Sequence, residues 1–247
     1  MFLKCNRPGR RSWRHLAVAA LCLASVSCST LSAQDEPAYF GQWAPTPPMG
    51  WNSWDVYGPT VREDEVRANA EYMAEHLKEH GWEYVVVDIR WYVSNAKSGG
   101  YQQFPEYNMD EYGRYQPAVN RFPSAEGGKG FKPLADYVHS LGLKFGIHIM
   151  RGIPIYAFEK NTPILGTEYT ARDVAREGDT AGWLRDNWGV AASRPGAQEY
   201  YDSIIQMYAD WGVDYIKVDD ISRPYAWDEV ELIRNAIDKT GRPIVLS

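Results

Sequence analysis

Short apolar runs alternate with amphipathic stretches along most of this chain. The segments "YVVVDI" (84–89) and "KFGIHIM" (144–150) are continuous apolar runs of strand length, and "YIKVDD" (215–220) starts the same way before it turns acidic. Between such runs, apolar residues recur every three or four positions, as in "AQEYYDSIIQMYADWG" (197–212). These periodicities predict buried strands connected by helices that pack on them.

The whole pattern predicts an α/β fold with five strands. We expect strands near 49–54, 84–89, 144–150, 215–220 and 243–247, and helices near 60–80, 131–142, 197–212 and 226–241. Thr60 and Glu63 have the spacing of a capping box that opens the first helix. Strands separated by helices pair in parallel, with both faces of the sheet covered.

Two long stretches, 90–130 and 151–196, each follow a strand and are rich in Gly and polar residues. We predict them to be irregular loops, and loops in this position build active sites at the carboxyl ends of parallel strands. Neither a Gly-x-Gly-x-x-Gly nor a Walker motif follows a strand, which argues against a dinucleotide or phosphate site. We therefore predict a (β/α)8 TIM-type barrel that is truncated after about five strands.

The N-terminus has the pattern of an export signal. Five basic residues and no acid occupy 1–15, and the apolar stretch "LAVAALCLASVS" follows at 16–27. This apolar stretch is short for a membrane-spanning helix, so we predict a leader over 1–33 and a Pro-rich linker over 34–48. The partial (β/α)8 barrel is then expected over 49–247.

Two processing sites compete in this leader. "LSA" before Gln34 suits a signal peptidase, whereas "ASVSC" ending at Cys28 resembles a lipoprotein box that would attach a lipid anchor. The protein is thus expected in the periplasm, outside the cell, or anchored at the cell surface, with membrane contact only through Cys28. All three cysteines lie in the leader, so residues 34–247 offer neither disulfides nor a thiolate nucleophile.

Composition and charge limit the kinds of molecule that the protein is expected to bind. The leader holds five of the 26 basic residues and none of the 32 acidic ones, so the rest of the chain is strongly acidic and a poor binder of nucleic acid. Ten Trp and 17 Tyr are compatible with a large aromatic core or with stacking against sugar rings. The sequence assigns no oligomeric state.

The acidic end of "YIKVDD" is the strongest candidate for chemistry. Side chains alternate along a strand, which puts Lys217 and Asp219 on one face and Asp220 on the other. An ammonium close to a carboxylate lowers the carboxylate's pKa, and an ionised carboxylate in a pocket can attack the anomeric carbon of a sugar. The alternative is that these aspartates cap the following helix.

Other residues near strand ends have two interpretations each. Asp88 ends its strand as Asp219 does, and His148 lies in a strand without a second ligand at metal-binding spacing. His148 is therefore either a core residue or a hydrogen-bond donor, and we predict no metal site. The acidic pair Asp228 and Glu229 is expected on a solvent-exposed helix face. Several tryptophans follow strands and favour a sugar-binding floor over isolated core residues, namely Trp51, Trp54, Trp91, Trp183 and Trp188.

Four segments together resemble family 27 of the glycoside hydrolases, the melibiase-type α-galactosidases. They are "PPMGWNSW", "YVVVDIRW", "RFPSAEGGKGFKPLADYVHSLGLKFGIHI" and "ADWGVDYIKVDD", in the family's order, and the likeness runs from about 45 to 247. The resemblance implies that Asp219 is the nucleophile and that Lys217 binds sugar hydroxyls. It also implies substrate contacts from Asp88, which matches an acid that holds the sugar's 4- and 6-hydroxyls, and from the residues Trp51, Ile89, Trp91 and His148.

Two departures from the family pattern matter. The family usually has Asp-Asp where this chain has Asp88-Ile89, so an acceptor for the 6-hydroxyl is replaced by an apolar side chain. L-Arabinopyranose resembles galactose without that hydroxymethyl group, and the family includes β-L-arabinopyranosidases. The second departure is that the family's acid/base aspartate falls in a later strand, beyond Ser247, so the chain is expected to lack it.

The resemblance predicts a retaining exo-glycosidase that removes terminal α-D-galactosyl residues, with a carbohydrate substrate and no metal or organic cofactor. One alternative is a β-L-arabinopyranosidase. Another, from a different class, is a non-catalytic sugar-binding lipoprotein of the cell surface. A third is an α/β binding protein of unrelated fold, for which the order of the four motifs would be coincidental.

Overall fold

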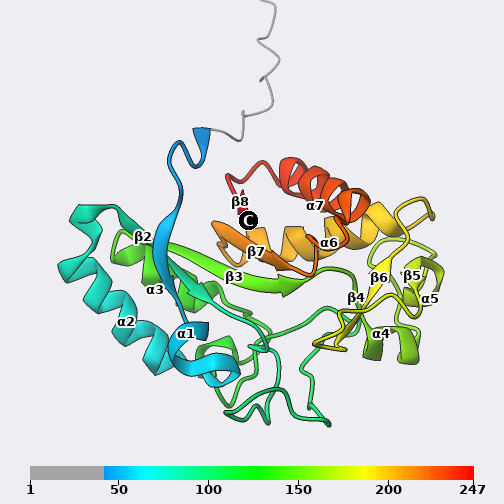
Figure 1. Cartoon of the computed structure of the whole chain (residues 1–247), viewed down its shortest axis with the longest axis horizontal. Coiled ribbons are helices and arrows are strands. Elements are labelled where there is room, and N and C mark those ends of the chain that lie inside the picture. Colours follow the sequence, from blue (N-terminus) through cyan, green and yellow to red (C-terminus); the bar gives the residue numbers. More distant parts are fainter. Residues whose placement is uncertain (1–41) are drawn as a thin grey trace, which may run out of the picture. The chain divides into compact units, whose positions relative to one another are not determined.

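The structure is a computed structural model that describes residues 42–247 (Figure 1). The predicted leader over 1–33, the lipidation site at Cys28 and most of the predicted linker over 34–48 lie outside the described residues. Within the described part, no helix combines the length and apolarity that crossing a bilayer requires.

A five-stranded parallel sheet forms the centre of the fold. Its strand order is β1-β2-β3-β7-β8, and the strands are β1 (Met49–Asn52), β2 (Trp82–Val87), β3 (Lys144–Met150), β7 (Tyr215–Asp219) and β8 (Val245–Leu246). The helices that connect them are α1 (Trp54–Tyr57), α2 (Glu63–His76), α3 (Lys132–Ser140), α6 (Ala197–Asp210) and α7 (Trp227–Thr240). The prediction of five strands in a parallel α/β arrangement is confirmed.

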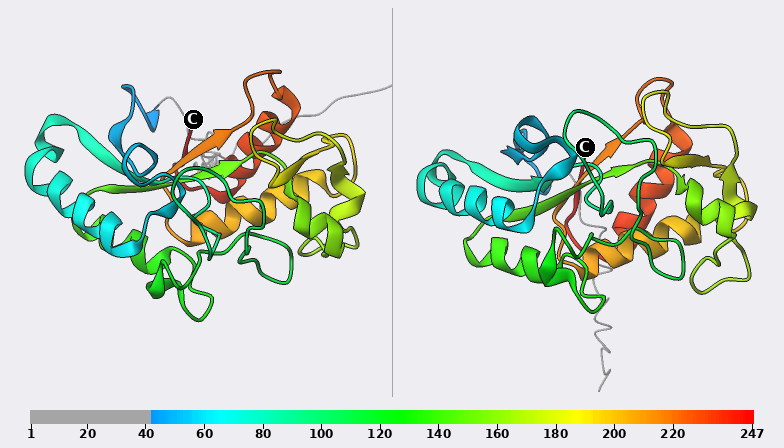
Figure 2. Two further views of the ribbon diagram at one scale, coloured as in Figure 1. Left: turned by 60° about the horizontal axis from the view of Figure 1, so that its bottom comes forward. Right: turned by 90° about the horizontal axis from the view of Figure 1, so that it is seen from below.

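The two faces of this sheet differ in chemistry. Val85 and Val87 of β2, Phe145 and Ile147 of β3, and Ile216 of β7 belong to the main hydrophobic core, together with apolar residues of all four long helices. Figure 2 shows α2, α3, α6 and α7 covering this face. Because side chains alternate along strands, His148, Lys217 and Asp219 project from the opposite face. Alternation along the strands thus places the apolar side chains on the helix-covered face and the candidate catalytic side chains on the other face.

The two long connections are more ordered than predicted. The segment after β3 contains the small antiparallel sheet β4-β6-β5, formed by β4 (Ile153–Pro154), β6 (Asn187–Val190) and β5 (Ala175–Arg176). It also contains two short helices, α4 (Ile155–Lys160) and α5 (Ala171–Val174). The connection after β2 holds one 3₁₀ turn, η4 (Pro123–Ala125). Elements of two to six residues are too short to leave a periodic signal in the sequence.

The start of α2 also differs from the prediction. Thr60 lies in a separate 3₁₀ turn, η2 (Gly58–Thr60), where its hydroxyl donates to the carbonyl of Tyr57 at 2.7 Å. A second 3₁₀ turn, η3 (Lys78–His80), follows the helix. The carboxylate that reaches back to the helix start is Glu65, which accepts from the Arg62 N–H at 2.8 Å. Glu63 binds Arg67 instead, at 2.7 Å.

Candidate active site

Three adjacent strands bring four polar side chains together at their carboxyl ends. Asp88 follows β2, His148 lies in β3, and Lys217 and Asp219 lie in β7. In the β3–β7 register, His148 is level with Lys217 and Met150 with Asp219. The prediction that Lys217 and Asp219 share a face is therefore borne out in position, and the structure adds Asp88 and His148 beside them.

Asp219 is held by His148. The His148 Nε2 lies 3.2 Å from an Asp219 carboxylate oxygen, and the backbone N–H of Asp220 donates to the other oxygen at 3.1 Å. The His148 side chain is fully buried, whereas the Asp219 side chain is 40% exposed and accessible to a substrate. The hydrogen bond from His148 is the main cause that holds the pKa of Asp219 below its usual value, against the opposing effect of burial.

Asp88 is held by Lys217. The Lys217 Nζ donates to one Asp88 carboxylate oxygen at 2.8 Å, the Asn52 amide donates to the same oxygen at 2.7 Å, and the Ile89 N–H donates to the other at 2.7 Å. Burial opposes ionisation of Asp88, but the Coulombic effect of His148 and the hydrogen bonds from Lys217 and from the Ile89 N–H together lower its pKa. We expected Lys217 to be the principal partner of Asp219. It instead pairs with Asp88, and His148 takes that role for Asp219.

Asp88, Lys217 and Asp219 line a pocket of about 360 Å³, together with Trp54, Ile89, Tyr101 and Trp183. His148, which was also expected to contact substrate, is fully buried and does not line it. Tyr101 stands between the two tryptophans, with its ring centroid 5.8 Å from that of Trp54 and 5.9 Å from that of Trp183. Ile89 belongs to a small apolar cluster with Met150, Ala181 and Leu184, against which Tyr101 packs. The pocket therefore combines a carboxylate, an ion pair and an aromatic wall.

Trp51 and Trp91 do not line this pocket, contrary to the prediction. Trp51 lies within β1 and is level with Val85, so alternation turns it to the helix-covered face, where its ring meets Tyr57 edge-on. Trp91 is fully buried, and its indole N–H donates to the His148 carbonyl at 2.8 Å. Trp54 and Trp183, two other tryptophans predicted for a sugar-binding floor, do line the pocket. Tyr101 also lines it, and nothing in the sequence distinguishes Tyr101 from the other tyrosines of its loop.

Asp220 is turned away from the pocket and does not cap the next helix. It adopts a left-handed conformation (φ 63°), and α7 begins only at Trp227. Its carboxylate lies 3.1 Å from the Arg151 Nε, and the same guanidinium contacts Glu229 at 2.8 Å and Asp179 at 2.7 Å. Glu229 is completely buried in this cluster, so the prediction that it faces solvent is wrong.

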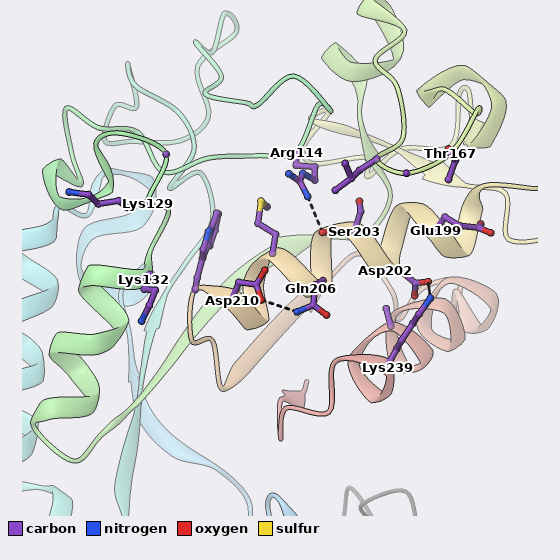
Figure 3. Close-up of a pocket in the computed structure, with 16 residues that line it drawn as sticks. Arg114, Lys129, Lys132, Thr167, Glu199, Asp202, Ser203, Gln206, Asp210 and Lys239 are labelled. Carbon is purple, nitrogen blue, oxygen red and sulfur yellow. Dashed lines mark hydrogen bonds and ion pairs between the residues drawn. The ribbon is translucent and has the colours of Figure 1, made fainter.

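A larger hollow of about 720 Å³ lies on the outer face of α6, away from the strand ends (Figure 3). Several of its polar side chains are engaged with neighbours: Lys239 with Asp202 at 2.6 Å, Gln206 with Asp210 at 2.8 Å, and Arg114 with the Ser203 carbonyl at 3.2 Å. This hollow presents charges of both signs and no nucleophile held by a base, so the chemistry belongs to the smaller pocket.

A parallel α/β sheet with an ionised, partly exposed aspartate at the carboxyl end of a strand is the architecture of a barrel glycosidase. The family model described as "Alpha galactosidase A" matches the chain over residues 46–157 and 161–247. The chain belongs to this melibiase family, family 27 of the glycoside hydrolases.

Individual relatives agree with this assignment. A β-L-arabinopyranosidase from Geobacillus stearothermophilus is 62% identical with a TM-score of 0.82, covering 84% of this chain and 48% of its own. A putative α-N-acetylgalactosaminidase from Bacillus halodurans is 56% identical with a TM-score of 0.77, covering 82% and 48%. "Alpha-galactosidase A" of Cellvibrio japonicus is 33% identical over 92% of this chain and 44% of its own length. The chain thus spans about half the length of these relatives.

Proposed function

We propose that the protein is a retaining exo-glycosidase of the α-galactosidase type, with Asp219 as its nucleophile. The observation that carries this proposal is the geometry of Asp219: its carboxylate is kept ionised by His148, is partly exposed, and opens into a sugar-sized pocket. Attack of an Asp219 oxygen on the anomeric carbon forms a glycosyl ester as the bond to the leaving oxygen breaks. Water then cleaves the ester and restores the configuration.

The leaving oxygen needs a proton from a second carboxyl group, roughly 5–5.5 Å from the nucleophile in a retaining enzyme. Among the described residues, the other carboxylate that lines the pocket is Asp88. It is ionised and accepts hydrogen bonds from Lys217 and Asn52, so it is suited to hold sugar hydroxyls rather than to donate a proton. The proposed reaction therefore requires a proton donor from outside residues 42–247.

Chemical rescue tests the nucleophile. In the full-length protein, Asp219→Gly should abolish turnover of a p-nitrophenyl glycoside, and azide should restore part of it by attacking from the vacated side to give a glycosyl azide of inverted configuration. Asp220→Asn, which neutralises the adjacent carboxylate outside the pocket, should retain most of the activity. Undiminished turnover by Asp219→Gly contradicts the assignment.

A second candidate, β-L-arabinopyranosidase, is favoured by Ile89. This side chain belongs to the apolar cluster at the pocket wall, where a 6-hydroxyl would lose its hydrogen bonds to water without gaining a partner. The similarity to the Geobacillus arabinopyranosidase supports the same specificity. The test compares the p-nitrophenyl α-D-galactoside and β-L-arabinopyranoside. On this second candidate, the wild type should prefer the arabinopyranoside and Ile89→Asp should move the preference toward the galactoside, whereas a wild type that cleaves only the galactoside contradicts this role of Ile89.

The rival from another class is a sugar-binding surface protein without activity. The p-nitrophenyl glycoside assay distinguishes this sugar-binding protein from the proposed enzyme. Sugar binding by the full-length protein without hydrolysis of either glycoside would favour the sugar-binding protein.

We also propose that the protein is exported, on the basis of the basic and apolar pattern of its first 33 residues. Mass spectrometry of the mature N-terminus distinguishes the two processing routes. A chain starting at Gln34 indicates secretion, a lipid-modified Cys28 indicates anchoring, and an intact Met1 contradicts export.

A further inference from the structure

Two of the three rings in the aromatic wall of the pocket come from loops that are far apart in the sequence. Tyr101 belongs to the connection after β2, and Trp183 to the connection after β3. Their ring centroids are 5.9 Å apart, yet both loops are long and their tips carry little regular structure. Rings can form a defined surface for a sugar only if something fixes these loops to each other.

A buried ion pair joins the two loops directly behind the wall. Arg90 follows Ile89 in the first loop, and Asp186 lies three residues after Trp183 in the second. The Arg90 guanidinium donates to both Asp186 oxygens, at 2.9 and 3.2 Å, and both side chains are at most 3% exposed. Tyr92 and Tyr107 donate their hydroxyls to the same carboxylate at 2.9 and 2.7 Å. The carboxylate is thus fully hydrogen-bonded, as a buried charge must be.

The same guanidinium also contacts the wall. The Arg90 Cζ lies 4.7 Å from the centre of the Tyr101 ring, in a cation–π arrangement. Its remaining nitrogen donates to the Gln102 side chain at 3.1 Å, and Gln102 in turn donates to the Asn95 side chain at 2.7 Å. Arg90 itself is held in a left-handed conformation (φ 65°), which a non-glycine residue adopts only when its surroundings enforce it. Arg90 therefore fixes both the ring of Tyr101 and the backbone that carries it.

We propose that Arg90 and Asp186 are positioning residues for substrate: their ion pair clamps the two loops together and sets the orientation of Tyr101, and thereby the affinity of the pocket for the sugar ring. The inference rests on the proposed function, since it takes the sugar pocket as the site that the clamp serves. Neither residue lines the pocket, and neither contacts Asp219 or His148. The clamp should therefore control binding and leave the chemical step nearly unchanged.

The test is a double-mutant cycle in the full-length protein. Asp186→Asn leaves Arg90 without its charge partner. It should raise KM roughly tenfold, which corresponds to the loss of one well-placed aromatic contact with the sugar. The value of kcat should stay within about threefold of the wild type. Tyr101→Ala should raise KM by a similar factor. If the clamp acts through Tyr101, adding Asp186→Asn to Tyr101→Ala should raise KM little further.

A matched control distinguishes positioning from general stabilisation. Asp110 binds Arg114 at 2.7 Å in the same loop, and Arg114 lies 5.3 Å from the Tyr112 ring, so Asp110→Asn breaks a similar arrangement away from the pocket. It should lower the melting temperature without changing KM. An unchanged KM in Asp186→Asn, or KM effects that multiply in the double variant, would overturn the inference.

Failure of the proposed function would give a different experimental result from failure of the proposed Arg90–Asp186 clamp. If the wild type hydrolyses neither glycoside, the proposed activity is wrong, and the clamp is then tested by calorimetric Kd values for free L-arabinose and D-galactose. A roughly tenfold weaker Kd in Asp186→Asn still supports the clamp, and an unchanged Kd refutes it. If Asp186→Asn fails to fold, Arg90→Lys provides the same test, because lysine keeps the charge but not the two-pronged geometry.

Discussion

His148 and Asp219 form a hydrogen bond of 3.2 Å in which the histidine ring is fully buried and the aspartate is partly exposed. The buried partner sets the electrostatics of the exposed one. Because the Trp91 indole also binds the His148 carbonyl, the ring is fixed from the backbone side as well. The pKa of Asp219 is thus set by a buried residue that a substrate does not contact.

The first prediction concerns this hydrogen bond. His148→Phe removes the main cause that lowers the pKa of Asp219, so that pKa should rise and the acid limb of the pH–rate profile should move to higher pH. Hydrogen bonds to a charged group are worth about 1.5–3 kcal/mol, and the exposure of Asp219 favours the low end, or roughly a tenfold loss of kcat/KM. His148→Gln keeps an N–H donor and should shift the acid limb less. An unmoved limb in His148→Phe would refute the role.

The second prediction concerns the Lys217–Asp88 pair. Lys217→Met leaves a carboxylate that is only 2% exposed without its cation, which should cost about 3 kcal/mol of unfolding free energy at pH 7. The pKa of Asp88 is lowered in the folded state, so the stabilisation from the pair is present above the unfolded-state pKa and is lost as pH falls through the folded-state pKa. Urea unfolding should therefore show the cost of Lys217→Met shrinking at acidic pH. The double variant Lys217→Met/Asp88→Asn should recover most of the loss, and a cost independent of pH would contradict this account.

The third prediction concerns the opposite end of the sheet. Asp214 precedes β7, and its carboxylate contacts His139 at 2.7 Å, the Phe145 N–H at 2.8 Å and Arg242 at 2.5 Å. Despite burial, these partners lower its pKa. Asp214→Asn should cost about 2 kcal/mol of stability at neutral pH, and this cost should shrink as pH falls through the lowered folded-state pKa of Asp214. Asp136→Asn, in an exposed pair with Lys132, should have little effect. Because Asp214 is remote from the pocket, kcat/KM below the melting temperature should stay at the wild-type value.

The fourth prediction concerns Arg151, whose guanidinium is shared by Asp179, Asp220 and Glu229. Arg151→Met leaves the fully buried Glu229 without its cation and should destabilise the fold by about 3–5 kcal/mol. Lys239→Met, which breaks an ion pair whose lysine is 71% exposed, should cost less than about 1 kcal/mol. Thermal denaturation of both variants measures the contrast, and equal losses would contradict the structural role.

The features that could be predicted are those that depend on the hydrophobic pattern within a single strand or helix. Strand alternation correctly separated Lys217 and Asp219 from Asp220, because the period of two is a local property of the backbone. The partner of each charge was not predictable, because Lys217 meets Asp88 and Asp219 meets His148 only through the register of three strands. Glu229 was misplaced for the same reason: its burial depends on Arg151, 78 residues earlier. Tyr101 and Asp186 were missed because their loops have no periodicity.

The separation of Asp88 from Lys217 by 129 residues also has a consequence during synthesis. A ribosome adds about 5–20 residues per second, so the carboxylate leaves the ribosome roughly ten seconds before its lysine. During that interval the nascent chain holds an acid that is buried in the finished protein but still has no cation. Until β7 is translated, the carboxylate of Asp88 has to stay solvated by water, so the carboxyl end of β2 is the part of the sheet that is buried late.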